Sequence, residues 1–385
     1  MGRPAPYLSS LHLFLAPRGL DAPLLQDISF DGDYPHLQIL NIYGCDIGKL
    51  DLGSMRRLKY FRVCYPFGNI LLRSLPSVTY LLRQLDYIQS SLQYLELERC
   101  WISNSTGSNL NLSFPRLRRL IISSTFAAVT SLLPYLAFPA TTGVRIMSFD
   151  ISDSDFHTLV AWLTQCFARS SSRGYRRIEY LYLSSKVDGL KGIMLSTWPD
   201  SNTNGERAPS QFSLRLHASV MMMGSQDSRI DNLLSVLPLA DLQRLRYCFS
   251  PDESESLLQY FQTLPSLHTI EHIGAAFLEK TVRALTQDQR SGRSSIESHP
   301  PFISDTFVPF PALRHIVLES LDFSLGVQRV WQPDLWPDRF AEALLARHEH
   351  GAPLPAIVLK KCRGVDMDYI EKLRSLNISV FVEDD

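Results

Sequence analysis

Residues 91–102 read SLQYLELERCWI, and the spacing of the apolar residues in this stretch decides the fold prediction. Leucines fall at Leu92, Leu95 and Leu97, and Cys100 follows three residues after the last of them. Within YLELE, the leucines alternate with polar residues, and alternate side chains of a β-strand point to opposite faces. The stretch therefore predicts a short strand whose leucines enter a core. The residues between the leucines, Tyr94, Glu96 and Glu98, are then presented on the other face.

The same L-x-x-L-x-L spacing, or an apolar variant of it, recurs along the chain at residues 37–42, 58–63, 117–122, 144–149, 178–183, 242–247, 313–318 and 354–359. Residues 212–216 and 267–270 are weaker matches. One such unit cannot bury its apolar face alone, which explains why the pattern repeats. The spacing, with its terminal Cys slot, resembles the leucine-rich repeat. It predicts an α/β fold: an irregular leucine-rich-repeat solenoid, or horseshoe, with a concave parallel β-sheet and convex helices.

The segments between the repeats predict helices on the convex side, at residues 153–171, 227–237, 255–264, 337–351 and 366–376. Asp153 is a candidate N-cap, and Gly351 is placed to end its helix. The apolar run ISVFV at 378–382 predicts a last strand. Two polar stretches near 196–211 and 286–306 are rich in Ser, Pro and Gly, and are interpreted as loop insertions. The prediction is therefore a single domain over residues 1–385.

Composition excludes several function classes. A formal net charge of -1 gives no global field for nucleic acid or an anionic membrane. No stretch approaches the roughly 20 apolar residues of a membrane helix. The six cysteines form no CxxC pair, which favours thiols in a reducing compartment, cytoplasmic or nuclear. Phosphate-loop, dinucleotide, HExxH and GxSxG motifs are absent, and His348 and His350 are interpreted as a solvated helix end. We expect no enzyme activity, cofactor or metal.

Irregular repeats, helical inserts, L-x-x-L-x-L-x-x-C strands and the C-terminal stretch KKCRGVDMDYIEKLRSLNISVFVEDD (360–385) together resemble the repeat region of fungal-type F-box/leucine-rich-repeat proteins. The resemblance covers essentially the whole chain. It implies that the repeats select a substrate, which an N-terminal F-box docks onto a cullin–RING ubiquitin ligase. The F-box signature, a Leu-Pro opening short apolar helices, does not appear ahead of Leu8, so cullin–RING components are expected partners only if an F-box is supplied elsewhere.

The residues between the strand leucines line the predicted concave face and are the candidate binding site for a protein partner. They are Tyr43, Tyr60, Arg62, Tyr94, Glu96, Glu98, Arg119, Tyr180, Tyr182, Arg244, Arg246, His315 and Glu319. Tyrosine and arginine recur here, and both are over-represented among interface hot spots. The alternative is that tyrosine simply suits an exposed strand. Two functions stay open: a substrate-recognition adaptor of F-box ancestry, or a stand-alone interaction or scaffold protein without a ligase role.

Overall fold

The x-L-x-L-x segments form short parallel β-strands, and helices lie in the segments between them, which gives an α/β fold. The computed structural model describes residues 7–14, 34–44, 47, 50–65, 77–98, 110–139, 141–149, 153–170, 178, 180–187, 190–198, 212–217, 226–248, 260–273, 281, 285, 309–321 and 336–383. The chain falls into two units. Unit 1 takes in residues 1–176, 190–193 and 209–223, and unit 2 takes in 177–189, 194–208 and 224–385.

The sheet of unit 1 consists of parallel strands in the order β1-β2-β3-β4-β6-β8-β11. Their bounds are β1 (Ser10–Phe14), β2 (Ile39–Tyr43), β3 (Tyr60–Cys64), β4 (Tyr94–Glu98), β6 (Arg119–Thr125), β8 (Gly143–Phe149) and β11 (Phe212–His217). Two further short strands, β5 (Leu112–Ser113) and β7 (Leu136–Ala137), pair with each other.

Pairing between neighbouring strands places the repeat leucines opposite one another. Fully buried rows run through Leu40, Phe61, Leu95, Leu120 and Val144, and through Ile42, Val63, Leu97, Ile122 and Ile146. One predicted register is wrong. The L-x-x-L-x-L match at 144–149 predicts that Val144 is equivalent to Leu117, the first leucine of the preceding repeat. In the sheet, Val144 instead pairs with Leu120, the second leucine of that repeat. The segment GVRIMSF has apolar residues in both phases of the alternation, so the pattern alone could not decide between them.

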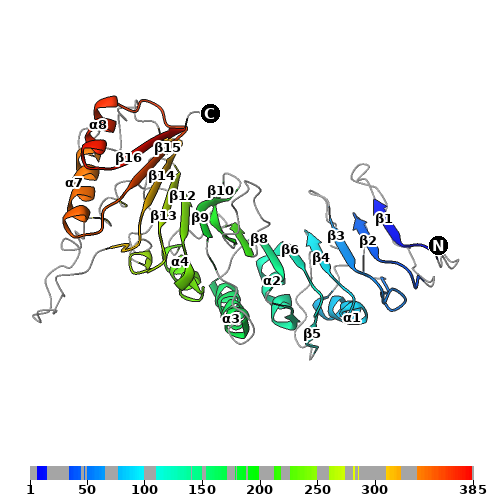
Figure 1. Ribbon diagram of the computed structural model, residues 1–385. Helices are drawn as coiled ribbons and strands as arrows, with labels where there is room; N and C mark the ends of the chain where they lie inside the picture. The colour runs from blue at the N-terminus through cyan, green and yellow to red at the C-terminus, as the bar shows by residue number, and fades with distance from the viewer. Residues whose placement is uncertain are drawn as a thin grey trace, which may run out of the picture. The chain divides into compact units, whose positions relative to one another are not determined.

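Three helices of unit 1 follow one another along one side of its strands (Figure 1). They are α1 (Val78–Ile88), α2 (Phe126–Leu132) and α3 (Asp153–Ser170), and a 3₁₀ turn, Leu133–Tyr135, follows α2. The hydroxyl of Ser77 caps α1 by accepting a hydrogen bond from the amide of Tyr80 at 3.1 Å. The buried residues of α1 recur at helical spacing: Val78, Leu81, Leu82, Leu85 and Ile88. The helices therefore bury their apolar sides.

The sheet of unit 2 is also parallel, in the order β9-β12-β13-β14-β15-β16. Its strands are β9 (Tyr180–Val187), β12 (Arg244–Cys248), β13 (Thr269–Ile273), β14 (His315–Glu319), β15 (Ala356–Lys360) and β16 (Ser379–Glu383). Its helices are α4 (Gln226–Ser235), the 3₁₀ turn Leu239–Asp241, α7 (Trp336–Glu349) and α8 (Met367–Ser375). Strand β10 (Leu190–Trp198) has residues in both units.

The core row of unit 2 continues the repeat pattern. It contains Leu181, Leu245, Ile270, Ile316, Ile357 and Val380, all of them buried. In the next row, Tyr247 and His272 are buried with their rings edge to face at a centroid distance of 5.0 Å. The hydroxyl of Tyr247 lies 2.5 Å from that of Thr281, which satisfies a polar group inside the core.

Among the residues that the structure describes, Arg347 has the largest fully buried side chain. Its guanidinium donates to the carbonyl oxygens of Pro309 and Phe310, the second at 3.1 Å, and so ties α7 to the turn before β14. Loss of solvent around the charge lowers the pKa of Arg347 to about 10.

The other predictions have mixed outcomes. The helices predicted near 153–171, 227–237, 337–351 and 366–376 and the last strand are confirmed, and Gly351 has the positive φ of 76° expected of a residue that ends a helix. The insertion at 196–211 begins too early, because 196–198 belong to β10. Most of the helix at 255–264 and all of 286–306 lie outside the described residues. The single domain over 1–385 stays a prediction.

Candidate functional site

Each strand has a second face, formed by the side chains that alternate with the buried leucines. We call these side chains the polar face. In unit 1 it contains Tyr60, Arg62, Tyr94, Glu96, Glu98, Arg119 and Ile121, and in unit 2 it contains Tyr182, Arg244, Arg246, Glu271, His315, Val317 and Glu319. The parallel register places the described candidate residues on this face of their own unit, as the period-2 alternation requires.

Four charged side chains form one ionic cluster in unit 1. The guanidinium of Arg62 donates from Nη2 to both carboxylate oxygens of Glu98, at 3.2 and 3.3 Å. Its Nε lies 3.4 Å from Oε2 of Glu96. On the other side of that carboxylate, Nε of Arg119 lies 3.8 Å from Oε1. Glu96 is therefore held between arginines of the two neighbouring strands, and its side chain is only 10% exposed.

Two tyrosines extend this cluster at the start of the strands. The rings of Tyr60 and Tyr94 lie side by side, 6.0 Å apart and tilted by 41°. The hydroxyl of Tyr60 donates to Oε2 of Glu96 at 3.1 Å. Burial raises the pKa of the Tyr60 hydroxyl, and the adjacent Glu96 carboxylate raises it further, so the hydroxyl keeps its proton and remains a donor.

Unit 2 carries a corresponding ionic cluster. Arg244 Nη2 lies 2.5 Å from Oε1 of Glu271, and Arg246 Nη1 lies 3.8 Å from Oε2 of the same carboxylate. Arg246 also reaches across to Glu319, with Nη2 2.8 Å from Oε2. The guanidinium carbon of Arg246 lies 5.8 Å from the ring centroid of Tyr182, within the range of a cation–π contact. The side chain of Glu271 is 8% exposed.

The two clusters share an order of residues across three neighbouring strands. At equivalent positions, β3, β4 and β6 present Arg62, Glu96 and Ile121, whereas β12, β13 and β14 present Arg246, Glu271 and Val317. In each unit, two arginines offset two glutamates, so the cluster is neutral. Each charged head is held by at least one partner, which limits its freedom before any ligand arrives.

The remaining candidates are placed less completely. His315 is exposed on β14, and Tyr43 is half-buried on β2, where its ring lies 6.1 Å from that of exposed Phe14. The backbone of Tyr180 pairs with Arg244, and its side chain lies outside the described residues. The sequence reasoning missed Glu271. Its strand, TIEHI, does not alternate clearly, because His272 stands where the repeat has its third apolar residue, and only Leu267 and Ile270 match the spacing.

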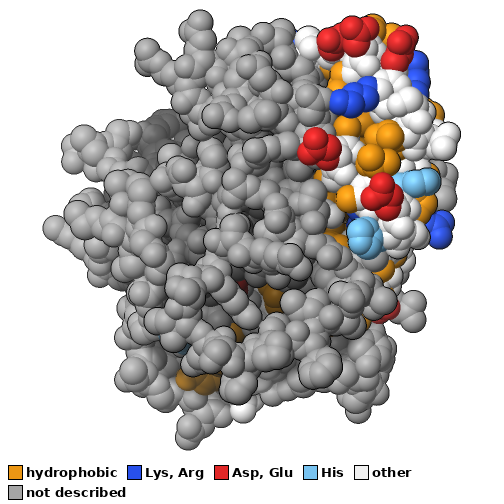
Figure 2. Space-filling model, turned by 90° about the vertical axis from the view of Figure 1, so that its left-hand side faces the viewer, with side chains coloured by type: hydrophobic (Ala, Val, Ile, Leu, Met, Phe, Trp, Pro, Cys, Tyr) orange, Lys and Arg blue, Asp and Glu red, His pale blue; other side chains and the backbone are white. Residues whose placement is uncertain are grey.

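No group of three or more His, Cys, Asp or Glu side chains within the described ranges could hold a metal ion. His348 and His350 are both exposed at the end of α7, and Nδ1 of His350 lies 2.6 Å from the carbonyl oxygen of Ala346. On the side of unit 2 shown in Figure 2, acidic, basic and histidine side chains are interspersed with apolar ones over the described surface. Among the helices described, none is both long and apolar enough to cross a bilayer.

The thiols of the four described cysteines form no disulfide. Cys362, in the terminal slot of its repeat, has Sγ 3.3 Å from the carbonyl oxygen of Leu318 in the neighbouring strand. Cys362 thus links its repeat to the preceding one where the chain turns.

Searches with the sequence give no named relative: no protein-family model matches it, and no curated protein does.

Proposed function

We propose that the chain is a protein-recognition module that binds a protein partner through the polar face of its parallel strands. In this proposal the units are parts of an irregular leucine-rich-repeat solenoid, with the polar face concave and the helices convex. Support comes from the shared register of the strands, with a buried apolar residue at the same place in neighbouring repeats. A recurring unit that stacks only on its neighbours is the basis of solenoid architecture.

The single observation that carries the proposal is the composition and order of the polar face in unit 1. Tyrosine rings, a fixed arginine and an exposed arginine lie side by side there, and the arginine Arg119 has a side chain that is 50% exposed. Tyrosine and arginine supply large contact areas and several donors, and they dominate the binding energy of many protein interfaces. Ion pairs that already exist within the face lower the entropy lost on binding.

The kind of partner follows from charge. Because the ionic clusters are neutral, they attract neither polyanions nor polycations at long range. A folded or extended protein segment with aromatic and hydrogen-bonding groups would complement the polar face better. We propose further that this recognition selects substrates for a ubiquitin ligase, as the F-box resemblance implies. The alternative is an interaction or scaffold protein with no ligase link.

Site-specific photo-crosslinking tests the proposal. A benzophenone amino acid replaces Tyr94 on the polar face or, as the matched control, Tyr87, which is 48% exposed on α1. We expect irradiation in cells to attach a discrete partner to the Tyr94 derivative and to leave the Tyr87 derivative without it. Crosslinks of equal yield at both positions would contradict recognition through the face. Cullin and RING subunits that co-purify with the adduct would support the ligase role, and their absence would favour the scaffold.

A further inference from the structure

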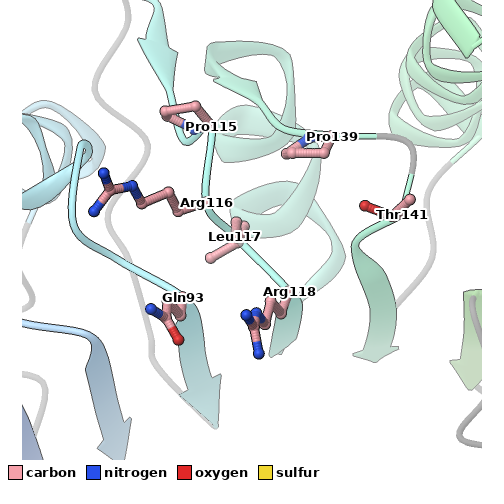
Figure 3. A pocket seen from close by; sticks show the side chains of 7 residues that line it. All are labelled: Gln93, Pro115, Arg116, Leu117, Arg118, Pro139 and Thr141. Carbon is pink, nitrogen blue, oxygen red and sulfur yellow. The ribbon is translucent and has the colours of Figure 1, made fainter. Parts of the chain in front are cut away.

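A pocket lies beside the polar face in unit 1, at the starts of three neighbouring strands. It has a volume of about 450 Å3 and is lined by Gln93, Pro115, Arg116, Leu117, Arg118, Pro139 and Thr141. These residues come from the segments that lead into β4, β6 and β8 (Figure 3). The backbone fixes these segments, because the carbonyl oxygen of Gln93 accepts from the amide of Arg118 at 2.7 Å, and that of Arg118 accepts from Gly143 at 2.8 Å. Backbone hydrogen bonds at the entry to the strands therefore hold Gln93 and Arg118, which line the pocket.

The charged residues that line this pocket are all basic. Arg116 and Arg118 are exposed, the lining contains no carboxylate, and within the described residues neither arginine forms an ion pair. The surrounding sequence has the same bias: residues 100–149 contain four arginines and no lysine, aspartate or glutamate. The whole chain has a net charge of -1, so this segment differs sharply from the average. One of the four arginines, Arg119, pairs with Glu96 on the polar face. The two that line the pocket, Arg116 and Arg118, have no carboxylate beside them in the lining and attract negatively charged groups.

The shape of the pocket distinguishes between kinds of anion. In Figure 3 the guanidinium groups of Arg116 and Arg118 point in different directions and do not converge on one point. A single small anion would not be gripped by both, whereas an extended chain with negative charges at separate positions could pair with each. The rings of Pro115 and Pro139 lie at the opposite end from Gln93 and Arg118 and offer an apolar wall.

We propose that this pocket binds an acidic peptide segment of a protein partner. Its carboxylates would pair with Arg116 and Arg118, the amide of Gln93 and the hydroxyl of Thr141 would bond to its backbone, and an apolar residue would pack on the two prolines. The residues that line the pocket are not among those of the polar face, whose ionic clusters are neutral. The inference therefore stands whether or not the face binds a partner.

The test measures the affinity of the full chain for a fluorescein-labelled peptide of alternating glutamate and proline, by fluorescence anisotropy. The variant is Arg116→Glu with Arg118→Glu. The matched control is Arg56→Glu with Arg57→Glu, an adjacent exposed pair of the same unit with the same change in charge. We expect the pocket variant to weaken binding by about tenfold or more, and the control by less than about threefold. Should the charge reversal unfold the protein, Arg116→Gln with Arg118→Gln repeats the measurement with a milder change.

Three results would overturn the inference. The first is no binding of the acidic peptide. The second is an equal loss in the pocket variant and the control, which would show that only net charge matters. The third is displacement of the peptide by inorganic phosphate at concentrations as low as those of the peptide itself, which would identify a site for an isolated anion. A counterpart peptide with glutamine in place of glutamate should bind at least about tenfold more weakly than the acidic one.

Discussion

Replacing Leu95 by alanine is expected to lower the free energy of unfolding by about 2–5 kcal/mol, because the change removes buried methyl groups and leaves a cavity. Leu95 is fully buried in β4 and pairs with Phe61 and Leu120 of the neighbouring strands, which are also fully buried. Hydrogen bonds between the strands fix the positions of these side chains, so Phe61 and Leu120 cannot move far into the cavity that the substitution leaves. Urea denaturation followed by circular dichroism measures the loss.

The matched control for this change is Leu345→Ala. Leu345 lies on α7 with 43% of its surface exposed, so the same atoms are removed with little transfer from the core. A cost within about 0.5 kcal/mol is expected there. If the two substitutions cost the same, the assignment of the repeat leucines to a core would be contradicted.

Neutralising Glu271 should have the second largest effect, a destabilisation of about 2–3 kcal/mol. Glu271→Gln keeps the shape of the side chain but removes the charge that Arg244 and Arg246 share. Breaking a buried ion pair from one side costs roughly 3–5 kcal/mol. We lower that range because Arg244 is 40% exposed, and solvent screens part of the interaction. The measurement is again the free energy of unfolding in urea.

Glu383→Gln is the control for this second prediction. The pair of Lys360 and Glu383 has a similar separation, 3.1 Å, but its side chains are 41% and 57% exposed. Exposed pairs contribute little, so we expect a change below about 1 kcal/mol, reduced further at high salt. Equal costs for the two substitutions would show that the cluster of unit 2 is no better shielded from solvent than an ordinary surface pair.

The register of most strands could be predicted because most repeats place buried, largely apolar residues at two alternate positions of the strand. A third apolar residue lies three positions before the first of them. Wherever that alternation is clear, as in YLELE, the buried and presented residues follow from it. Where both faces carry apolar side chains, as in GVRIMSF, the phase was assigned wrongly. The helix α1 was not predicted, although Val78, Leu81 and Leu85 recur at helical spacing.

The ionic clusters could not be predicted from the sequence alone. The alternation shows that Arg62 and Glu96 lie on one face, but their contact depends on which strands are neighbours and on the side-chain conformations. Glu98 and Glu319 show that the partner of a glutamate cannot be read from its position in the repeat. Both bind an arginine, but Glu98 reaches one on the adjacent strand, whereas Glu319 reaches one two strands away. The pocket could have been suspected from the acid-free stretch at 100–149, but its walls require the structure.

The most direct measurement is the dissociation constant of the crosslinked partner, once purified, for a double variant of the polar face. Tyr94→Ala with Arg119→Ala removes two side chains that pair across β4 and β6 and opens no core cavity. The matched control, Tyr87→Ala with Arg83→Ala, removes the same two residue types from exposed positions on α1. Recognition through the polar face predicts at least about tenfold weaker binding for the first variant and less than about twofold for the control. Unchanged affinity in a folded Tyr94→Ala, Arg119→Ala protein would contradict it.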